Sequence, residues 1–353
     1  MLYTTFRLLL CACLLAGTSQ AERPSVILDS GTAHLTIDLL GGGITGFELK
    51  GLALNPFTWE QKGAEDEARP RGHFLCLDRW GAPSDAEKAN GMPFHGEASK
   101  VLWKVLSKSE FEVTMSADLP LAKLAIVRTA RIVPGSALVE VSETVTNRNP
   151  LGRIFNWVQH PSIAPPFLDE TTIVNANAGE GFPQWAPMPE PEEMAERWPM
   201  ARSEKKTVDV SQLTNDPNPN VVSYVVDADM GWTTATTASK QLLVGYLWST
   251  KDYPWFNVWR DVKDGKPAAR GLEFGTTGLH QPYPVLVKKG TIFNRSLYAY
   301  LDAGESQTRS YTMFLTRVPS QYSGTAAVTR AGKRITIREK TLGRPMIYVG
   351  TAQ

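Results

Sequence analysis

Residues 155–161 read Phe-Asn-Trp-Val-Gln-His-Pro, and this stretch decides how the rest of the chain is interpreted. It predicts an apolar strand that ends on His160, after which Pro161 and the prolines at 165 and 166 break the pattern. Proline removes a ladder N–H and an unpaired buried imidazole costs free energy, so neither suits a strand interior. We therefore expect the strand end to form one wall of a pocket between Trp157 and Phe167. Taken alone, the stretch also fits a core histidine bonded to a carbonyl.

The first 21 residues predict an exported protein. Arg7 gives a positive start, residues 8–15 give an apolar run too short to span a bilayer as a helix, and Ser19-Gln20-Ala21 resembles a cleavage site. We expect residues 1–21 to be a signal peptide and the mature protein to be periplasmic or secreted. We expect no membrane anchor after cleavage.

The composition of the remaining chain excludes several classes of protein. Two of the three cysteines fall in the leader, which leaves Cys76 and no internal disulfide. Arg7 is the only charged leader residue, so 37 − 1 = 36 basic residues balance 36 acidic residues. A net charge of zero gives no reason to expect nucleic acid or an anionic membrane as a partner. The composition does not fix an oligomeric state.

The chain from Ser25 onward predicts an all-β protein. Residues 109–117 alternate apolar and polar side chains, as a half-buried strand does, and long amphipathic helices are missing. We expect antiparallel sheets packed face to face. Further strands are expected at residues 33–40, 44–49, 124–132, 139–145, 221–226, 241–248, 256–260, 292–301 and 307–315. The glycines at 41–43 and 46 match a dinucleotide fingerprint, but a strand follows them instead of a helix, so we predict a turn.

Two segments depart from this pattern. Residues 183–220 contain seven prolines, an acidic run and two tryptophans, Trp185 and Trp198, which suggest an insertion loop that packs onto the protein as a lid. Within it, residues 192–197 could form a short helix. Residues 319–353 predict a C-terminal extension with extra strands at 334–338 and 346–349. We expect one β-sandwich domain over residues 22–318.

Two further stretches could carry chemistry. In residues 91–97, glycine and proline place His95 on a loop or strand end, and upstream Arg79 and Trp80 end another apolar strand. In residues 269–275, Glu273 lies between Leu272 and Phe274 with glycines on both sides. Such apolar surroundings disfavour the charged carboxylate and raise its pKa toward that of a working base. The alternative is an ion pair between Glu273 and Arg270 or Arg260.

The order of these elements resembles the aldose 1-epimerase, or galactose mutarotase-like, superfamily. An early histidine precedes a glycine, a second histidine ends a strand in mid-chain, a Trp-Arg strand follows at residues 255–260, and a Gly-Leu-Glu strand comes last. The likeness covers roughly residues 25–317, outside the insertion. The residues after Glu273, His160 and His95 differ from the usual family motifs, which indicates a divergent branch.

The resemblance implies a galactose mutarotase-like β-supersandwich that binds a mono- or oligosaccharide in an open cleft. It implies that Glu273 is the base and His160 the acid of an anomer interconversion that uses no cofactor and no metal. The remaining candidate substrate contacts are His95, Arg79, Trp80, Glu97, Trp157, Gln159, Trp255 and Arg260.

Three other functions remain open at this point. The first is a carbohydrate-binding protein on the same fold without turnover, and the second is a polysaccharide-cleaving enzyme. The third is a metal site, since His95 and Glu97 lie two residues apart and His73 or Asp78 could complete it.

Overall fold

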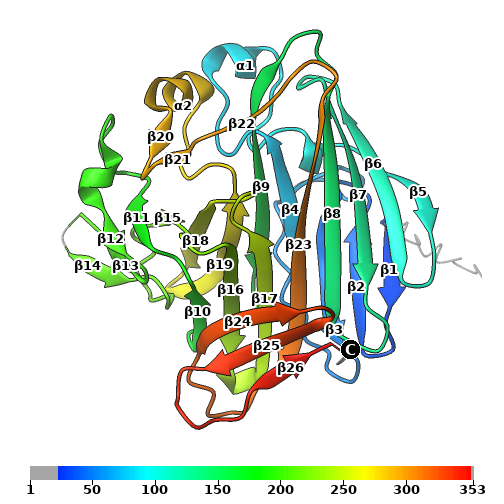
Figure 1. Cartoon of the computed structure of the whole chain (residues 1–353), viewed down its shortest axis with the longest axis vertical. Helices are drawn as coiled ribbons and strands as arrows, with labels where there is room; N and C mark the ends of the chain where they lie inside the picture. The colour runs from blue at the N-terminus through cyan, green and yellow to red at the C-terminus, as the bar shows by residue number, and fades with distance from the viewer. Residues whose placement is uncertain (1–22, 205, 351–353) are drawn as a thin grey trace, which may run out of the picture.

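The computed structural model describes residues 23–204 and 206–350, so the predicted leader lies outside the described residues. Two large sheets pack face to face, and the strands of each pair antiparallel with their neighbours (Figure 1). This is the all-β sandwich that the alternating sequence predicts. Within the described residues, no helix is both long and apolar enough to cross a membrane.

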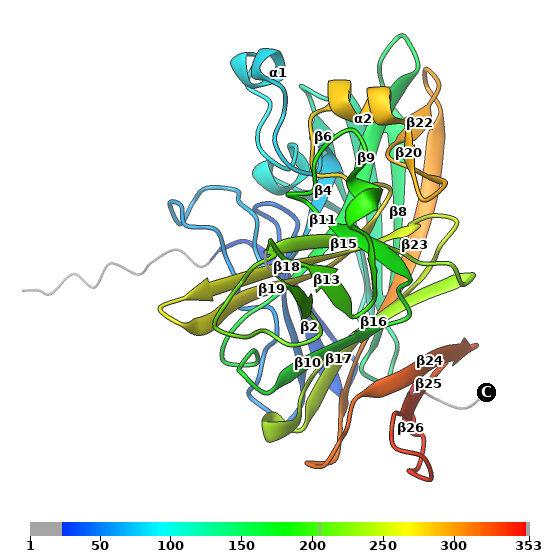
Figure 2. The same cartoon turned by 90° about the vertical axis from the view of Figure 1, so that its left-hand side faces the viewer.

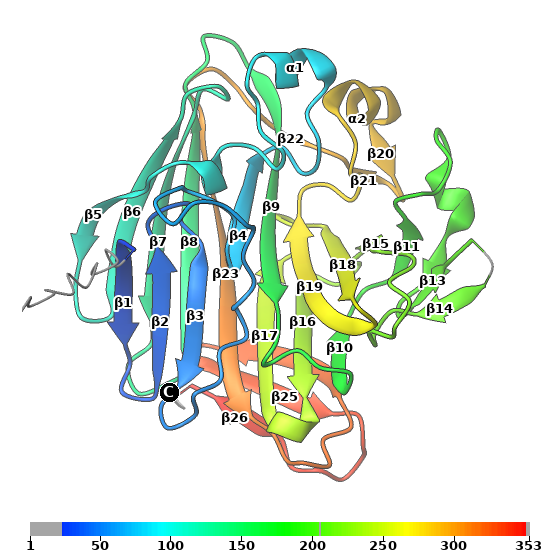
Figure 3. The ribbon, with the colours of Figure 1, turned by 180° about the vertical axis from the view of Figure 1, so that it is seen from behind.

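The larger sheet has 11 strands and carries the stretches singled out from the sequence. Figure 3 shows β4, β9 and β19 of this sheet side by side. In spatial order its strands are β1 (Ser25–Asp29), β2 (Ala33–Asp38), β3 (Ile44–Leu49), β4 (His73–Asp78), β9 (Arg153–Ile163), β19 (Lys266–Gly275), β18 (Trp255–Lys263), β15 (Val221–Val225), β11 (Glu180–Pro183) and β12 (Glu196–Arg197), with β22 (Ala299–Leu301) also pairing with β9.

The smaller sheet has eight strands and lies behind the larger one in the view of Figure 3. In spatial order its strands are β10 (Thr172–Ala176), β16 (Met230–Thr237), β17 (Leu242–Ser249), β23 (Ser306–Arg317), β8 (Leu138–Asn147), β7 (Leu124–Ile132), β6 (Glu112–Leu119) and β5 (Lys104–Lys108). The inward side chains of both sheets form one large apolar core, to which β6 contributes the predicted face of Val113 and Met115.

The remaining elements are short. They are the helices α1 (Asp85–Ala89) and α2 (Tyr283–Lys289), the 3₁₀ turns η1 (Ala98–Lys100), η2 (Pro191–Met194) and η3 (Ala238–Lys240), and the strand pairs β13 (Met200–Arg202) with β14 (Thr207–Asp209) and β20 (Thr291–Ile292) with β21 (Arg295–Ser296). The single strand expected at residues 292–301 is wrong. Phe293 and Asn294 adopt positive φ angles of 49° and 57°, so the chain turns there.

The Pro-rich segment 183–220 lies at one edge of the larger sheet, to which it contributes β12. The short helix expected at residues 192–197 is wrong, since η2 ends at Met194 and residues 196–197 form β12; β13 and β14 follow. Trp198 packs edge-on against Tyr224 and Phe256, with ring centroids 5.2 and 5.5 Å apart. Trp198 therefore fastens the segment to the edge of the core.

The C-terminal segment adds a third layer at one end of the molecule (Figure 2). Its strands are β24 (Thr325–Ala331), β25 (Arg334–Glu339) and β26 (Ile347–Val349), of which the sequence suggested the last two. Ile335 and Ile337 pack against Leu243 and Phe314 in a second apolar cluster. Because the neighbours Leu242 and Leu315 point into the main core, this layer covers the outer face of the eight-stranded sheet.

Candidate active site

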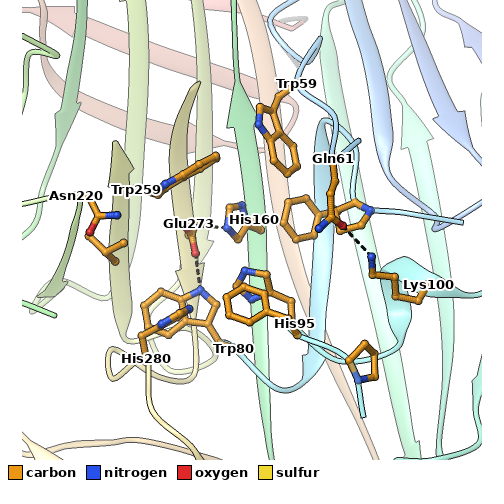
Figure 4. Close-up of a pocket in the computed structure, with 15 residues that line it drawn as sticks. Trp59, Gln61, Trp80, His95, Lys100, His160, Asn220, Trp259, Glu273 and His280 are labelled. Carbon is orange, nitrogen blue, oxygen red and sulfur yellow. Dashed lines mark hydrogen bonds and ion pairs between the residues drawn. The ribbon is translucent and has the colours of Figure 1, made fainter. Parts of the chain in front are cut away.

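A pocket of about 420 Å³ lies on the outer face of the 11-stranded sheet (Figure 4). Small-molecule pockets usually measure about 300–1,000 Å³ and are mostly apolar with a few polar groups. This one is lined by Trp59, Gln61, Pro70, Phe74, Trp80, Pro93, Phe94, His95, Lys100, His160, Asn220, Val221, Trp259, Glu273 and His280. The three residues on which the sequence hypothesis depends, Glu273, His160 and His95, therefore share one pocket.

The expected end of the strand at His160 is wrong, because β9 continues to Ile163 with Pro161 paired to His73, and Trp157 and Phe167 lie in the core. Strand register nevertheless places Glu273 beside His160. On β19 and β9, Gly271 pairs with Ser162 and Phe274 with Gln159, so Glu273 lies across from His160. Both side chains point away from the core, and Glu273 Oε1 lies 3.2 Å from His160 Nε2. The other carboxylate oxygen, Oε2, accepts a hydrogen bond of 2.6 Å from the indole N–H of Trp80.

A glycine makes room for this carboxylate. Gly271 lies two residues before Glu273 and therefore on the same face of β19. A Cβ at Gly271 would lie 2.6 Å from Glu273 Oε1 and 3.0 Å from the Cβ of Trp259. The Gly-Leu-Glu motif thus has a steric reason, because a larger residue at 271 would displace the carboxylate.

The Glu273–His160 pair carries one acidic proton at neutral pH. Burial raises the pKa of Glu273 to about 8, and the hydrogen bond from Trp80 acts in the opposite direction. Burial lowers the pKa of His160 to about 3. Because the two groups touch, they titrate as a unit, with the proton on the carboxyl group or on the imidazole. We call this pair the dyad.

Local contacts fix the orientation of His160. Its ring stacks on Phe74 with centroids 4.2 Å apart, and its Nδ1 lies 3.0 Å from the Ser162 hydroxyl. That hydroxyl donates to the His160 carbonyl, so it accepts from Nδ1–H. Nε2 is therefore the nitrogen that exchanges a proton with Glu273.

His95 is held in a constrained conformation at the wall of the pocket. Its φ angle is 66°, a region that non-glycine residues adopt mainly where surrounding contacts enforce it. Its N–H donates to the Gly81 carbonyl, and its Nδ1 accepts from the Gly81 N–H, both at 3.0 Å. Burial lowers the pKa of His95 well below its usual value, so the ring is neutral. Its proton is then on Nε2, which leaves a hydrogen-bond donor for a ligand.

Glycine at position 96 is also explained by the structure. Gly96 has a φ angle of 75°, and a Cβ there would lie 2.1 Å from the Leu77 carbonyl oxygen. The His95-Gly96 motif therefore allows the loop to approach the backbone of β4 closely.

The sequence assigned no role to several residues that line the pocket, although the position of His280 before Gln281-Pro282 allowed it to line the cleft. Trp259 could have been found by strand alternation, since it shares the outer face of β18 with the partner of Glu273, Asn257. His280 follows β19 on a loop whose backbone is held by the Gln184 side chain at 2.8 Å. Trp59 and Phe94 lie on loops and Lys100 ends the short turn η1, so none of them carries a periodic signal.

Arg79 and Glu97 were predicted as substrate contacts and do not line the pocket. Arg79 forms ion pairs with Asp78 and Glu87, and its guanidinium lies 3.6 Å above the ring of Tyr283. Both carboxylate oxygens of Glu97 accept backbone N–H groups, from Leu121 at 3.2 Å and Ala122 at 2.7 Å. The guanidinium of Arg79 and the carboxylate of Glu97 thus both bind partners within the protein and are not directed at a ligand in the pocket.

Four other predicted contacts also lie outside the pocket. Trp157 and Gln159 have the opposite parity from His160 on β9, so they face the core and donate to Glu143 at 2.9 and 2.6 Å. Trp255 is buried and donates to the Ser296 carbonyl at 2.9 Å. Arg260 is buried against the carbonyl oxygens of residues 216, 217 and 219. Neither Arg260 nor Arg270 pairs with Glu273.

A metal site at His95 and Glu97 does not fit the geometry. Glu97 is committed to two backbone donors, and His95 Nδ1 accepts from Gly81. In the part of the chain that the structure describes, no group of three or more His, Cys, Asp and Glu side chains is arranged to hold a metal ion.

The fold is shared with solved structures, whereas no family model and no curated protein matches the chain. A galactose mutarotase related enzyme from Lactobacillus acidophilus superimposes with a TM-score of 0.62 and 13% identity, covering 84% of this chain and 98% of that one. A galactose mutarotase-like protein from Lactobacillus casei gives 0.61 and 14%, covering 83% and 100%. One from Clostridium acetobutylicum gives 0.60 and 13%, covering 84% and 96%.

These observations define the structural class of the protein. The chain is an antiparallel β-sandwich with a pocket on the outer face of its larger sheet. It has the galactose mutarotase-like fold, which the sequence resemblance implied.

Proposed function

We propose that this protein is an exported sugar isomerase that interconverts the two anomers of a reducing sugar. The observation that supports the proposal most directly is the contact of 3.2 Å between Glu273 and His160 inside an aromatic pocket. The comparisons with solved structures support the fold and leave the activity as our proposal.

The dyad has one proton to donate and one basic group to accept a proton, which are the two transfers that the reaction needs. With the proton on His160 Nε2, the Glu273 carboxylate takes the proton of the anomeric hydroxyl as His160 protonates the ring oxygen. The bond between C1 and the ring oxygen breaks and a carbonyl forms at C1. After rotation about C1–C2, the reverse transfers close the ring on the other face. One proton is given and one is taken, so the dyad is regenerated.

The geometry suits simultaneous transfer. The hydroxyl oxygen and ring oxygen of a hemiacetal are bonded to the same carbon, so they lie close together. A base and an acid must each come within about 2.6–3.2 Å of the atom they serve. Two groups 3.2 Å apart can contact both oxygens at once. A pKa of about 8 also makes Glu273 a stronger base than an exposed carboxylate.

The remaining pocket provides contacts that a sugar ring requires. Trp59 lies stacked beside Phe74 at 5.7 Å and edge-on to Trp259 at 5.5 Å, so indole and phenyl surface covers one side of the pocket. Apolar faces of sugar rings pack on such surface, and His95 offers a donor for a hydroxyl or the ring oxygen. We assign the binding role to these residues, and export to residues 1–21. Cell fractionation and N-terminal sequencing of the mature protein test the export step.

Exchange spectroscopy by NMR on a panel of monosaccharides tests the proposal. The wild-type protein should increase the rate of anomer exchange above the buffer rate for at least one sugar. Glu273→Gln should remove the increase while sugar binding, measured by calorimetry, is retained. A protein that binds sugars yet leaves each exchange rate at the buffer value would be a carbohydrate-binding protein, and the isomerase proposal would be rejected.

A further inference from the structure

One ammonium group lines the pocket on the side away from the dyad. Figure 4 shows Lys100 across the pocket from Glu273, with His95 between them in this view. Burial is the main cause that lowers the pKa of His95, and the charge of Lys100 adds to it. Lys100 ends η1, the short turn that follows the His95-Gly96 motif.

Lys100 has no carboxylate partner among the described residues. Its Nζ donates to the neutral Oε1 of Gln61 at 2.8 Å, and it forms no ion pair within 4.0 Å. Burial lowers the pKa of Lys100, and the charges of Glu67 and Arg69 shift it in opposite directions. A partly buried lysine is usually paired, so this ammonium is unusual within a pocket.

The other ionisable groups of the pocket leave this charge unbalanced. Burial lowers the pKa values of His95, His160 and His280, so these rings are neutral when considered singly. The dyad with its one proton carries no net charge in either arrangement. The lining groups therefore sum to +1 from Lys100, which complements a ligand with a single negative charge.

The donor set favours a carboxylate over a phosphate. One ammonium with a neighbouring amide, Gln61, suits a singly charged group. Phosphate dianions are typically bound by arginine forks, several cations or a helix N-terminus. Of the residues that line the pocket, none is an arginine and one is a lysine.

We propose that the pocket takes an acidic sugar, an aldohexuronate, with its anomeric carbon at the dyad and its carboxylate at Lys100 and Gln61. The orientation of the sugar rests on the proposed anomer interconversion, and the inference adds the substrate class. His95 lies between the two ends and contacts the ring portion of the sugar.

Calorimetric binding of D-glucuronate and D-galacturonate, compared with D-glucose and D-galactose, tests the inference independently of turnover. A charge-assisted hydrogen bond corresponds to about a tenfold or larger change in affinity. We expect each uronate to bind at least about tenfold more tightly than its parent hexose, and added salt to reduce the difference. Lys100→Met should remove the preference by weakening uronate binding about tenfold more than hexose binding. Lys62→Met, which removes an exposed charge from the loop of Gln61, is the matched control and should retain it.

The outcomes separate this inference from the proposed function. Equal affinity for uronates and hexoses overturns the acidic-sugar inference even if anomer exchange is accelerated. A preference for glucose 6-phosphate over the uronates overturns it as well. Equal losses for acidic and neutral sugars in Lys100→Met would show a structural role and reject it. A uronate preference that depends on Lys100 supports it, even in a protein that leaves anomer exchange at the buffer rate.

Discussion

Replacing Trp80 with phenylalanine tests how the protein controls the proton of the dyad. Trp80→Phe keeps an aromatic ring in a buried position but removes the N–H that donates to Glu273 Oε2 at 2.6 Å. Hydrogen bonds to charged groups contribute about 1.5–3 kcal/mol, and one pKa unit corresponds to about 1.4 kcal/mol. Because the neutral carboxyl group also accepts a hydrogen bond, we expect the pKa to rise by about one unit, near the lower end of that range.

The pH dependence of anomer exchange measures this change. The one-proton state of the dyad is present between the pKa of about 3 for His160 and of about 8 for Glu273, so the wild-type profile should fall on its alkaline side near the latter. Losing the Trp80 hydrogen bond destabilises the carboxylate. The alkaline limb of Trp80→Phe should therefore move to higher pH by about one unit, with a lower maximal rate.

A second tryptophan of the same pocket supplies the control. Trp259 lines the pocket and is half-buried, and its indole makes no hydrogen bond to Glu273. Trp259→Phe should alter sugar affinity and leave the alkaline limb in place. If Trp80→Phe leaves the limb in place too, or if both variants shift it equally, Trp80 does not set the pKa of Glu273 and our account of the dyad is wrong.

Three further predictions concern residues around the dyad. Gly271→Ala places a Cβ 2.6 Å from Glu273 Oε1, so the exchange rate should fall about tenfold or more at unchanged circular dichroism. Glu97→Gln keeps one acceptor oxygen but places an NH2 donor against the other backbone N–H, so thermal unfolding should show a loss of about 1–3 kcal/mol while the exchange rate of folded protein is unchanged. The folded pKa of Glu273, about 8, exceeds its ordinary value of 4.5, so its stabilising contribution is complete below 4.5 and lost as pH rises through 8. Urea unfolding should therefore show the wild type losing a few kcal/mol relative to Glu273→Gln between about pH 5 and about pH 9, and parallel curves would contradict the raised pKa.

The sequence alone was sufficient to predict structure where residue type depends on nearby contacts, as in strand alternation and in glycines at close approaches. The sequence predicts most of the longer strands of both large sheets but not β10 and β16, and the glycines beside His95 and Glu273 mark close approaches that the structure shows at Gly96 and Gly271. These positions depend on contacts with the adjacent strand or loop, so their residue types carry information. The order of such motifs was enough to indicate the fold.

The sequence alone was insufficient to predict contacts between a loop residue and a residue far away in the chain. Trp80 and Glu273 lie 193 residues apart, and nothing in either stretch predicts their hydrogen bond. The neighbouring Arg79 looked equally suitable for a ligand. The chain turns at Asp78, which adopts a φ angle of 82°. After this turn, Arg79 pairs with Asp78 and Glu87, whereas Trp80 lines the pocket. Which of two adjacent side chains enters the pocket is decided by this turn, which requires tertiary contacts to hold it.

The two faces of β9 show how the core contributes to the site. On the inner face, Gln159 donates to Glu143 at 2.6 Å and lies 3.2 Å from His73, and Glu143 pairs with Arg128 at 2.7 Å. A slip of one residue in register would exchange the faces of a strand and leave these buried polar groups unpaired. The inner contacts therefore penalise a slip of one residue, and the register they favour is the one that places His160 beside Glu273. Gln159 was predicted to touch the sugar, and its geometry instead supports a positioning role exerted from inside the sandwich.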